Sequence, residues 1–384
     1  MKSHSPIYLD YAAATPLDAR VKTVMDPYWS RMFYNPSATY LAAKRVAEDL
    51  GQARSQVASL LGARLNEIIF TAGGTEANNL AVHAVMQAHP GANVVVSNIE
   101  HDSILEPAKR YRYKACRVGA DGRIDLADLI AKIDDKTVLV SIIYANNEIG
   151  TIQPIRDIAA LLIQARQRRQ SQGNKLPLYF HIDACQAASY LDLHVGRLKV
   201  DMMTLNGGKI YGPKQSGNLY VKTGTVLIPQ IVGGGQEYNR RSGTENVAAN
   251  VGMACALSLV QSRREFEVAR LRTLQDYFLN LIADKLPNAF INGSLKHRLP
   301  NNVHLTLPGF DNERLMMQLD EAGIMCATGS ACSASNEEPS HVLKAIGLSD
   351  SDAQASLRFT MGRTTTKADV TYVVKTLAQI VDKQ

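Results

Sequence analysis

From about residue 66 onward, short hydrophobic runs alternate with longer segments in which hydrophobic residues recur three or four positions apart. Segments 125–133 and 155–169 have this helical spacing. Strands that alternate with helices predict an α/β fold, in which a mainly parallel sheet is covered by helices on both faces. The strand-like runs lie at residues 67–72, 93–100, 137–146, 177–184, 201–207 and 217–224.

The pattern changes near residue 260. A long charged helical segment at 262–286 precedes a strand-like segment at 302–309 and a final helix that begins at about Lys367. This order predicts a second, smaller α+β domain at the C-terminus. We place the large domain at residues 1–256 and the small domain at 257–384, and we expect about the first 14 residues to pack on the small domain.

The composition is that of a soluble globular protein, with 46% hydrophobic and 20% charged residues in a chain of 384. Residues 1–16 contain no long apolar segment, and no uncharged run reaches the roughly 18 residues of a membrane span. We therefore expect a cytoplasmic protein with no membrane partner.

Charge gives a weaker signal. The net charge of +6, from 42 basic and 36 acidic residues, favours anionic ligands but does not require a nucleic acid. Segment 109–117 alternates basic and aromatic residues, and we interpret it as a solvated helix end. No direct contact with nucleic acid is expected.

The five cysteines indicate reduced thiols. They form no CxxC pair and have no zinc-like spacing, and an odd number in a chain of this size argues against a disulfide framework. We expect no metal site, and one of these thiols is free to take part in chemistry. The five are Cys116, Cys185, Cys255, Cys326 and Cys332.

Polar and small residues follow several of the predicted strands, at the edge where α/β sheets bind ligands. Gly73, Gly74 and Thr75 lead from a strand into a helix. Backbone amides at a helix N-terminus together with a threonine hydroxyl form a phosphate site, although a plain strand-to-helix turn explains two glycines equally well.

Two further strand ends carry Asp183 and Lys209. Lys209 follows two glycines, which leaves room for an imine with a flat aldehyde cofactor. Asp183 suits either a pyridinium nitrogen or the N-cap of a helix. One helix and one strand separate these residues, so both side chains can reach one ring. His101 follows another strand, where it either stacks on such a ring and exchanges protons or serves a structural role.

Taken together, the motifs resemble those of cysteine desulfurases, the NifS-like branch of the class V aminotransferases, which have a fold type I pyridoxal phosphate (PLP) domain. The resemblance extends from Tyr8 to about Arg363 and implies a large domain with a mainly parallel seven-stranded sheet. The motifs occur in the family's order: YLDYAAATP, FTAGGTEANN, EHDSIL, ANNEIG, HIDACQ, GGKIYGPK, RRSGTEN, GSACSAS and LRFTMGR.

The resemblance implies catalytic roles for three residues. Lys209 would hold PLP through an imine bond and remove the α-proton of the substrate, while His101 would stack on the ring. Cys332, in a small and polar stretch, would attack the substrate sulfur and retain it as a persulfide. Asp183 would pair with the pyridine nitrogen.

Other positions are implied to bind the cofactor or the substrate. Arg358, assisted by Asn147, would hold the substrate carboxylate. Thr244 would reach the phosphate site of a neighbouring subunit, which implies a homodimer. The family's usual histidine and serine are replaced by Gly208 and Asn206, which places the phosphate contacts in doubt. The remaining implied cofactor ligands are Gly74, Thr75, Asn147, Gln186 and Asn206.

The implied reaction converts L-cysteine to L-alanine and passes sulfur to an acceptor protein, for iron–sulfur cluster assembly or for thiolation of tRNA or cofactors. One alternative is a selenocysteine lyase or another class V PLP aminotransferase. Another is a PLP-free pseudoenzyme that binds sulfur-transfer partners, for which Gly208 is the only support.

Overall fold

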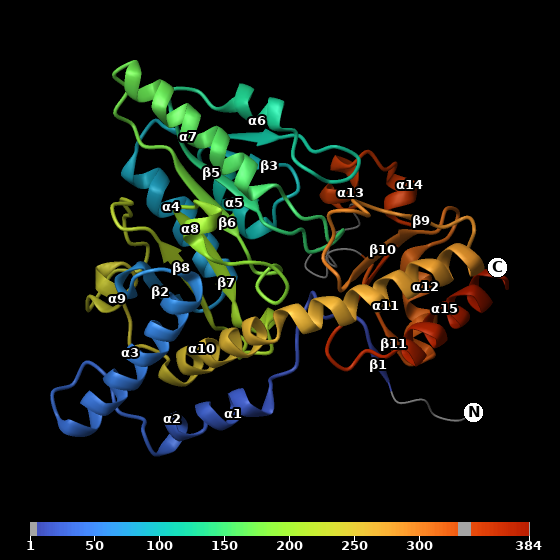
Figure 1. Ribbon diagram of the computed structural model, residues 1–384, viewed down its shortest axis with the longest axis horizontal. Helices are drawn as coiled ribbons and strands as arrows, with labels where there is room; N and C mark the ends of the chain where they lie inside the picture. Colours follow the sequence, from blue (N-terminus) through green and yellow to red (C-terminus); the bar gives the residue numbers. More distant parts are fainter. Residues whose placement is uncertain (1–5, 329–338, 384) are drawn as a thin grey trace.

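The structure is a computed structural model that describes residues 6–328 and 339–383. Its centre is a seven-stranded sheet with the strand order β2-β8-β7-β6-β5-β3-β4 (Figure 1). All neighbouring strands are parallel except at β8, which runs antiparallel to both β7 and β2. The strands are β2 (Ile68–Thr71), β3 (Asn93–Ser97), β4 (Arg112–Cys116), β5 (Thr137–Ile143), β6 (Tyr179–Asp183), β7 (Met202–Asn206) and β8 (Gly217–Val221).

Helices cover both faces of this sheet. Alternate strand residues point to opposite faces, so Ile69 packs with α4 (Gly74–Ala88) and α5 (Asp102–Lys109), while Ile68 and Phe70 belong to the core on the other face. The helices that contribute to that second core are α1 (Ala19–Met25), α3 (Leu41–Leu61), α6 (Leu126–Lys132), α7 (Ile155–Ser171), α8 (Val195–Leu198) and α10 (Val247–Ser262).

The expected α/β fold is confirmed, and each of the six expected strands contains an observed one. The interpretation of segment 109–117 as a solvated helix end is wrong. Residues Arg112–Cys116 form the edge strand β4, parallel to β3. Its first two side chains are exposed and only Cys116 is buried, so the strand lacks the hydrophobic run that marks the others.

A second, smaller α+β unit follows helix α10. Its antiparallel sheet has the order β12-β10-β9 and is covered by helices, among them the long α11 (Figure 1). The elements are α11 (Arg264–Lys285), β9 (Phe290–Ile291), β10 (Asn302–Thr306), α12 (Asn312–Glu321), α13 (His341–Ala345), α14 (Asp350–Ala353), β12 (Ser356–Thr360) and α15 (Lys367–Val381).

The N-terminal segment lies against the smaller unit. Strand β1 (Ile7–Tyr8) pairs with β11 (Ile324–Met325), and Ile7 and Leu9 are part of its hydrophobic core. The proposed boundary between residues 256 and 257 falls inside α10, so the division of the chain at that point stays a prediction.

Candidate active site

A cavity of about 270 Å³ lies at the carboxyl ends of the parallel strands, where the large sheet meets the smaller unit. Its lining combines loops after β2, β3, β5, β6 and β7 with Arg358 of β12 and His341 of α13. Most of the site residues predicted from the sequence line this one cavity: Gly74, Thr75, His101, Asn147, Asp183, Gln186, Asn206, Lys209 and Arg358.

Two predicted residues are not among them. Thr244 is exposed, in the loop between α9 (Gln236–Asn239) and α10. Cys332 lies outside the described residues.

Lys209 ends a short 3₁₀ turn, Gly207–Lys209, directly after β7. The side chain of Asn206 caps this turn, because its Oδ1 accepts a hydrogen bond from the Gly208 N–H at 2.9 Å. The Lys209 Nζ donates to two backbone carbonyls, at 2.8 Å to Ala12 O and 2.5 Å to Ala13 O. The amine therefore faces the cavity beside the N-terminal segment.

Asp183 is the last residue of β6 and is only 4% exposed. Its Oδ1 accepts from the Cys185 N–H at 2.9 Å, and its Oδ2 accepts from Asn78 Nδ2 at 2.7 Å. These two hydrogen bonds hold both carboxylate oxygens in place. The carboxylate thus has a fixed orientation at the cavity wall.

The start of α4 has the features of an anion site. Gly73 adopts a φ of 128°, which a side chain would strain, and no side chain caps the helix. A Cβ on Gly74 would lie 2.7 Å from Cys185 Sγ and 3.3 Å from Asn206 Nδ2. The bare amides of this turn therefore lie beside the Asn206 amide, a second donor for the same anion.

Arg358 places a guanidinium at the cavity and is 2% exposed. Its Nη2 pairs with Asp10 Oδ1 at 2.7 Å, and its Nη1 donates to the Asn147 carbonyl at 3.1 Å. Its buried Nε has no hydrogen-bond partner within the part of the chain that the structure describes. Such a donor matches an incoming carboxylate.

His101 is the N-cap of α5, and its Nδ1 accepts from the Ser103 N–H at 3.1 Å. The residue before it, Glu100, is fully buried, and burial raises the pKa of its carboxyl to about 8. Glu100 Oε1 accepts from the Ile143 N–H at 2.9 Å and also bonds Ser97 Oγ. This carboxyl lines the cavity, and its raised pKa favours the neutral form.

Sequence reasoning missed several residues that line the cavity or contact its lining. Asp10 and Asn78 lie inside motifs that were recognised, but nothing local shows that they contact Arg358 and Asp183. Asn78 is four residues after Gly74 and so lies on the same helix face, a signal that could have indicated it. His341 contacts the Glu100 carbonyl through Nε2 at 3.0 Å, a contact that sequence spacing does not reveal.

The four described cysteines are poor nucleophiles. Burial raises the pKa of the thiols of Cys116 and Cys326 to about 12, and it raises those of Cys185 and Cys255 as well. A thiol whose pKa is raised carries little thiolate at neutral pH. None of these four side chains is therefore suited to attack sulfur.

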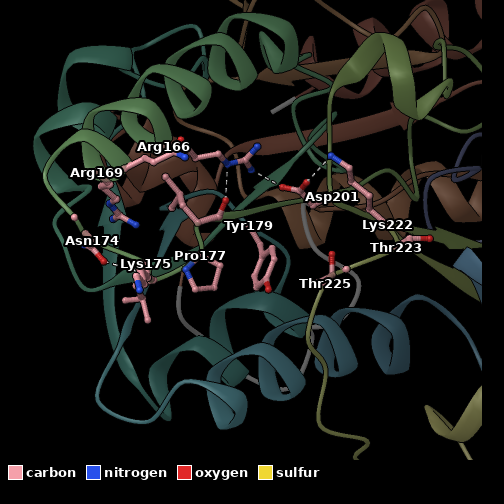
Figure 2. A pocket seen from close by; sticks show the side chains of 15 residues that line it. Arg166, Arg169, Asn174, Lys175, Pro177, Tyr179, Asp201, Lys222, Thr223 and Thr225 are labelled. Carbon is pink, nitrogen blue, oxygen red and sulfur yellow. Dashed lines mark hydrogen bonds and ion pairs between the residues drawn. The ribbon is translucent and has the colours of Figure 1, made fainter.

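A larger open hollow of about 690 Å³ lies at the other end of the strands, beside the amino ends of β6 and β7 (Figure 2). Its charged groups hold the fold together: Asp201 pairs with Arg166 and lies 3.5 Å from Lys222 Nζ. Arg166 Nε also donates to the Leu178 carbonyl at 2.8 Å. These charged groups are engaged with one another. Lys209, Asp183 and Arg358 line the smaller cavity instead, and that cavity is therefore the candidate active site.

Metal-binding clusters and membrane-spanning helices are both absent from residues 6–328 and 339–383. No group of three or more His, Cys, Asp or Glu side chains is arranged to hold a metal ion there. In the same ranges, no helix has the length and hydrophobicity needed to span a membrane.

Comparison with known proteins places the chain in a family. The sequence profile described as aminotransferase class-V matches residues 7–373. The chain belongs to the aminotransferase class-V family. The cysteine desulfurase IscS of Dictyoglomus turgidum is 38% identical over 384 residues, which cover 98% of this chain and 95% of that protein.

Two solved structures are similar in fold. A NifS-like protein has a TM-score of 0.89 at 28% identity, and the match covers 99% of this chain and 100% of that protein's chain. SspA in complex with cysteine has a TM-score of 0.80 at 32% identity, covering 92% of this chain and 98% of its own. The resemblance to cysteine desulfurases seen in the motifs is thereby confirmed.

Proposed function

We propose that this protein is a PLP-dependent cysteine desulfurase. It converts L-cysteine to L-alanine and transfers the sulfur, through a persulfide on Cys332, to an acceptor protein. The observation that carries this proposal is the convergence of Lys209, Asp183 and Arg358 on one cavity of about 270 Å³. An amine, a carboxylate and a guanidinium in one site suit an amino acid substrate bound to an aldehyde cofactor.

The residues present fit PLP. Lys209 would bind its aldehyde carbon and Asp183 its ring nitrogen, while His101 would lie against the ring. The phosphate would bind at the bare N-terminus of α4, through Gly74 and Thr75. Asn206 and Gln186 line the same cavity and would contribute amide hydrogens to the phosphate and to the ring oxygen.

When bound, PLP supplies an electron-accepting ring that makes the α-proton of the amino acid acidic. Lys209 would remove that proton, because its amine lies in the same cavity. Arg358 would bind the substrate carboxylate through Nε, assisted by Asn147, and so orient the α-carbon toward Lys209.

Sulfur transfer needs a thiolate, which we assign to Cys332. Its thiolate would attack the substrate sulfur, the carbon–sulfur bond would break, and alanine would leave. The raised pKa values of the thiols of Cys116, Cys185, Cys255 and Cys326 support this assignment because they disfavour each of these as the nucleophile.

A homodimer is part of the proposal. Large apolar side chains are exposed near α3, with Trp29 at 62%, Phe33 at 65% and Leu41 at 75%. The loop after β8 exposes Val232 at 76%. A buried ion pair between Arg54 of α3 and Glu237 of α9 shows that these two helices are neighbours.

An apolar face of this kind favours a second subunit. Thr244 lies in the loop that follows α9, and in the dimer it would contribute its hydroxyl to the partner's phosphate site. We further propose that the enzyme works in the cytoplasm and transfers sulfur to a scaffold or sulfurtransferase. Size-exclusion chromatography with light scattering tests the dimer, and a monomer would contradict it.

The function is tested on the full chain purified with PLP, by its visible absorbance and by alanine formed from L-cysteine. We expect both for the wild type, and a loss of turnover of at least about a thousandfold in Lys209→Ala. The matched control is Lys214→Ala, because Lys214 Nζ donates only to the Thr15 carbonyl at 3.0 Å among the described residues.

The outcomes separate the alternatives. Borohydride reduction should leave PLP on Lys209, and a label on Lys214 would overturn the site. A keto acid product in place of alanine would indicate an aminotransferase, and a strong preference for selenocysteine would indicate a selenocysteine lyase. A protein that binds no PLP would be a pseudoenzyme.

A further inference from the structure

A chain of hydrogen bonds joins the two residues that are proposed to contact the PLP ring. Asn78 Nδ2 lies 2.7 Å from Asp183 Oδ2 and 2.8 Å from Ser103 Oγ. Ser103 Oγ in turn lies 2.8 Å from His101 Nδ1. Asn78 and Ser103 are 1% and 7% exposed, so water does not compete strongly for these contacts.

The direction of each hydrogen bond follows from the groups involved. The Asn78 amide nitrogen has two hydrogens, one for Asp183 and one for Ser103. Turning this amide over would place its oxygen against the Asp183 carboxylate, which is repulsive. Ser103 Oγ therefore accepts from Asn78, and its own hydrogen is available for His101.

His101 receives two donors at the same nitrogen. The Ser103 backbone N–H can only donate, and it lies 3.1 Å from His101 Nδ1. The Ser103 hydroxyl faces the same lone pair. Nδ1 therefore carries no hydrogen, and a neutral imidazole with a bare Nδ1 has its hydrogen on Nε2.

We propose that Asn78 and Ser103 are positioning residues that hold His101 as the Nε2–H tautomer and, through Asn78, fix the Asp183 carboxylate. His101 then acts at Nε2 as a hydrogen-bond donor, not as a base. Proton removal from the substrate falls to Lys209. The role of His101 in turnover rests on the proposed function, but its tautomer does not.

The tautomer is measured by NMR of the full chain labelled with ¹⁵N-histidine, both with PLP and without it. The His101 signals are identified by their loss in His101→Gln. We expect a pyridine-like Nδ1 and a pyrrole-like Nε2 in both forms. A pyrrole-like Nδ1 in the wild type would overturn the proposal. The only variant that must fold for this measurement is His101→Gln, which identifies the signals.

Two variants test the positioning roles separately. Ser103→Ala removes the hydroxyl but keeps the backbone N–H, so we expect the Nδ1–H tautomer to gain about fivefold in population. Asn78→Ala removes a hydrogen bond to a carboxylate, and we expect the Kd for PLP to rise about tenfold or more. A merely structural residue would alter neither quantity while the fold is intact.

Asn174→Ala is the matched control, since Asn174 Nδ2 donates to the Asp135 carbonyl at 2.9 Å and this asparagine does not line the cavity. Its Kd should match that of the wild type. An unchanged Kd in Asn78→Ala, or an unchanged tautomer in Ser103→Ala, would refute the corresponding role. If the wild type binds no PLP, the proposed function fails, while the tautomer measured without PLP still decides this inference.

Discussion

Asp10 and Arg358 form an ion pair, with 2.7 Å between Oδ1 and Nη2, across a separation of 348 residues. It ties the N-terminal segment to strand β12 at the wall of the cavity. The Arg358 side chain is 2% exposed and the Asp10 side chain 17%. Asp10 thus balances a buried positive charge, while the Nε of Arg358 has no hydrogen-bond partner among the described residues.

Asp10→Ala should destabilise the protein, because it leaves a buried guanidinium without its partner. We expect the free energy of unfolding to fall by about 3 kcal/mol, measured by urea denaturation. The control Glu106→Ala breaks an exposed ion pair with Lys109, in which the Lys109 side chain is 50% exposed and the Glu106 side chain 63%. Its loss should cost less than about 1 kcal/mol. Equal losses in the two variants would show that the Asp10 pair contributes no more than a surface contact.

Cys332→Ala should retain the visible absorbance of PLP but form no alanine from cysteine, because only the attack on sulfur needs this thiol. Mass spectrometry of the wild type after cysteine treatment, without reductant, should find one additional sulfur on Cys332. Cys326→Ala is the control and should stay active, since burial raises the pKa of its thiol to about 12. A persulfide on Cys326 would contradict the assignment.

Gly208→His should slow the loss of PLP by about tenfold, since it adds a charge-assisted hydrogen bond to the phosphate. The site accepts a Cβ in ordinary van der Waals contact, at 3.4 Å from Asn206 Oδ1 and 3.7 Å from Lys214 Cγ. The rate is measured on dilution into a competing amine, with the wild type alongside. Equal rates would show that residue 208 does not reach the phosphate.

Glu100→Gln should flatten the dependence of stability on pH. Burial raises the pKa of the Glu100 carboxyl from 4.5 to about 8. Between these values the folded protein keeps a proton that the unfolded chain releases, so each rise in pH favours unfolding of the wild type. Glutamine has no such proton. The free energy of unfolding of Glu100→Gln, relative to that of the wild type, should therefore increase from pH 5 to pH 8.

Urea midpoints at several pH values measure this difference. His181 also titrates abnormally, because burial lowers its pKa to about 4, but it is present in both proteins and cancels in the comparison. Parallel pH profiles for the two proteins would mean that Glu100 is ionised in the folded state.

Local pattern predicted most of the elements. Strands β3 and β5 are built on hydrophobic runs, and α15 begins at Lys367 as the periodicity indicated. Strand β4 was missed because an edge strand buries little and its residues carry no hydrophobic run. A hydrophobic pattern indicates directly how much of a segment is buried. It indicates the conformation of that segment only indirectly.

The sequence by itself determined the alternation of strands and helices, and its motifs singled out Lys209, Asp183 and Arg358. These features depend on residues that are close together along the chain. Only the tertiary structure decided that Asp10 pairs with Arg358, and that Asn78 bonds Asp183 across 105 residues. Such contacts arise when the folded chain brings distant side chains to one cavity, and neither side chain carries a local signal of its partner.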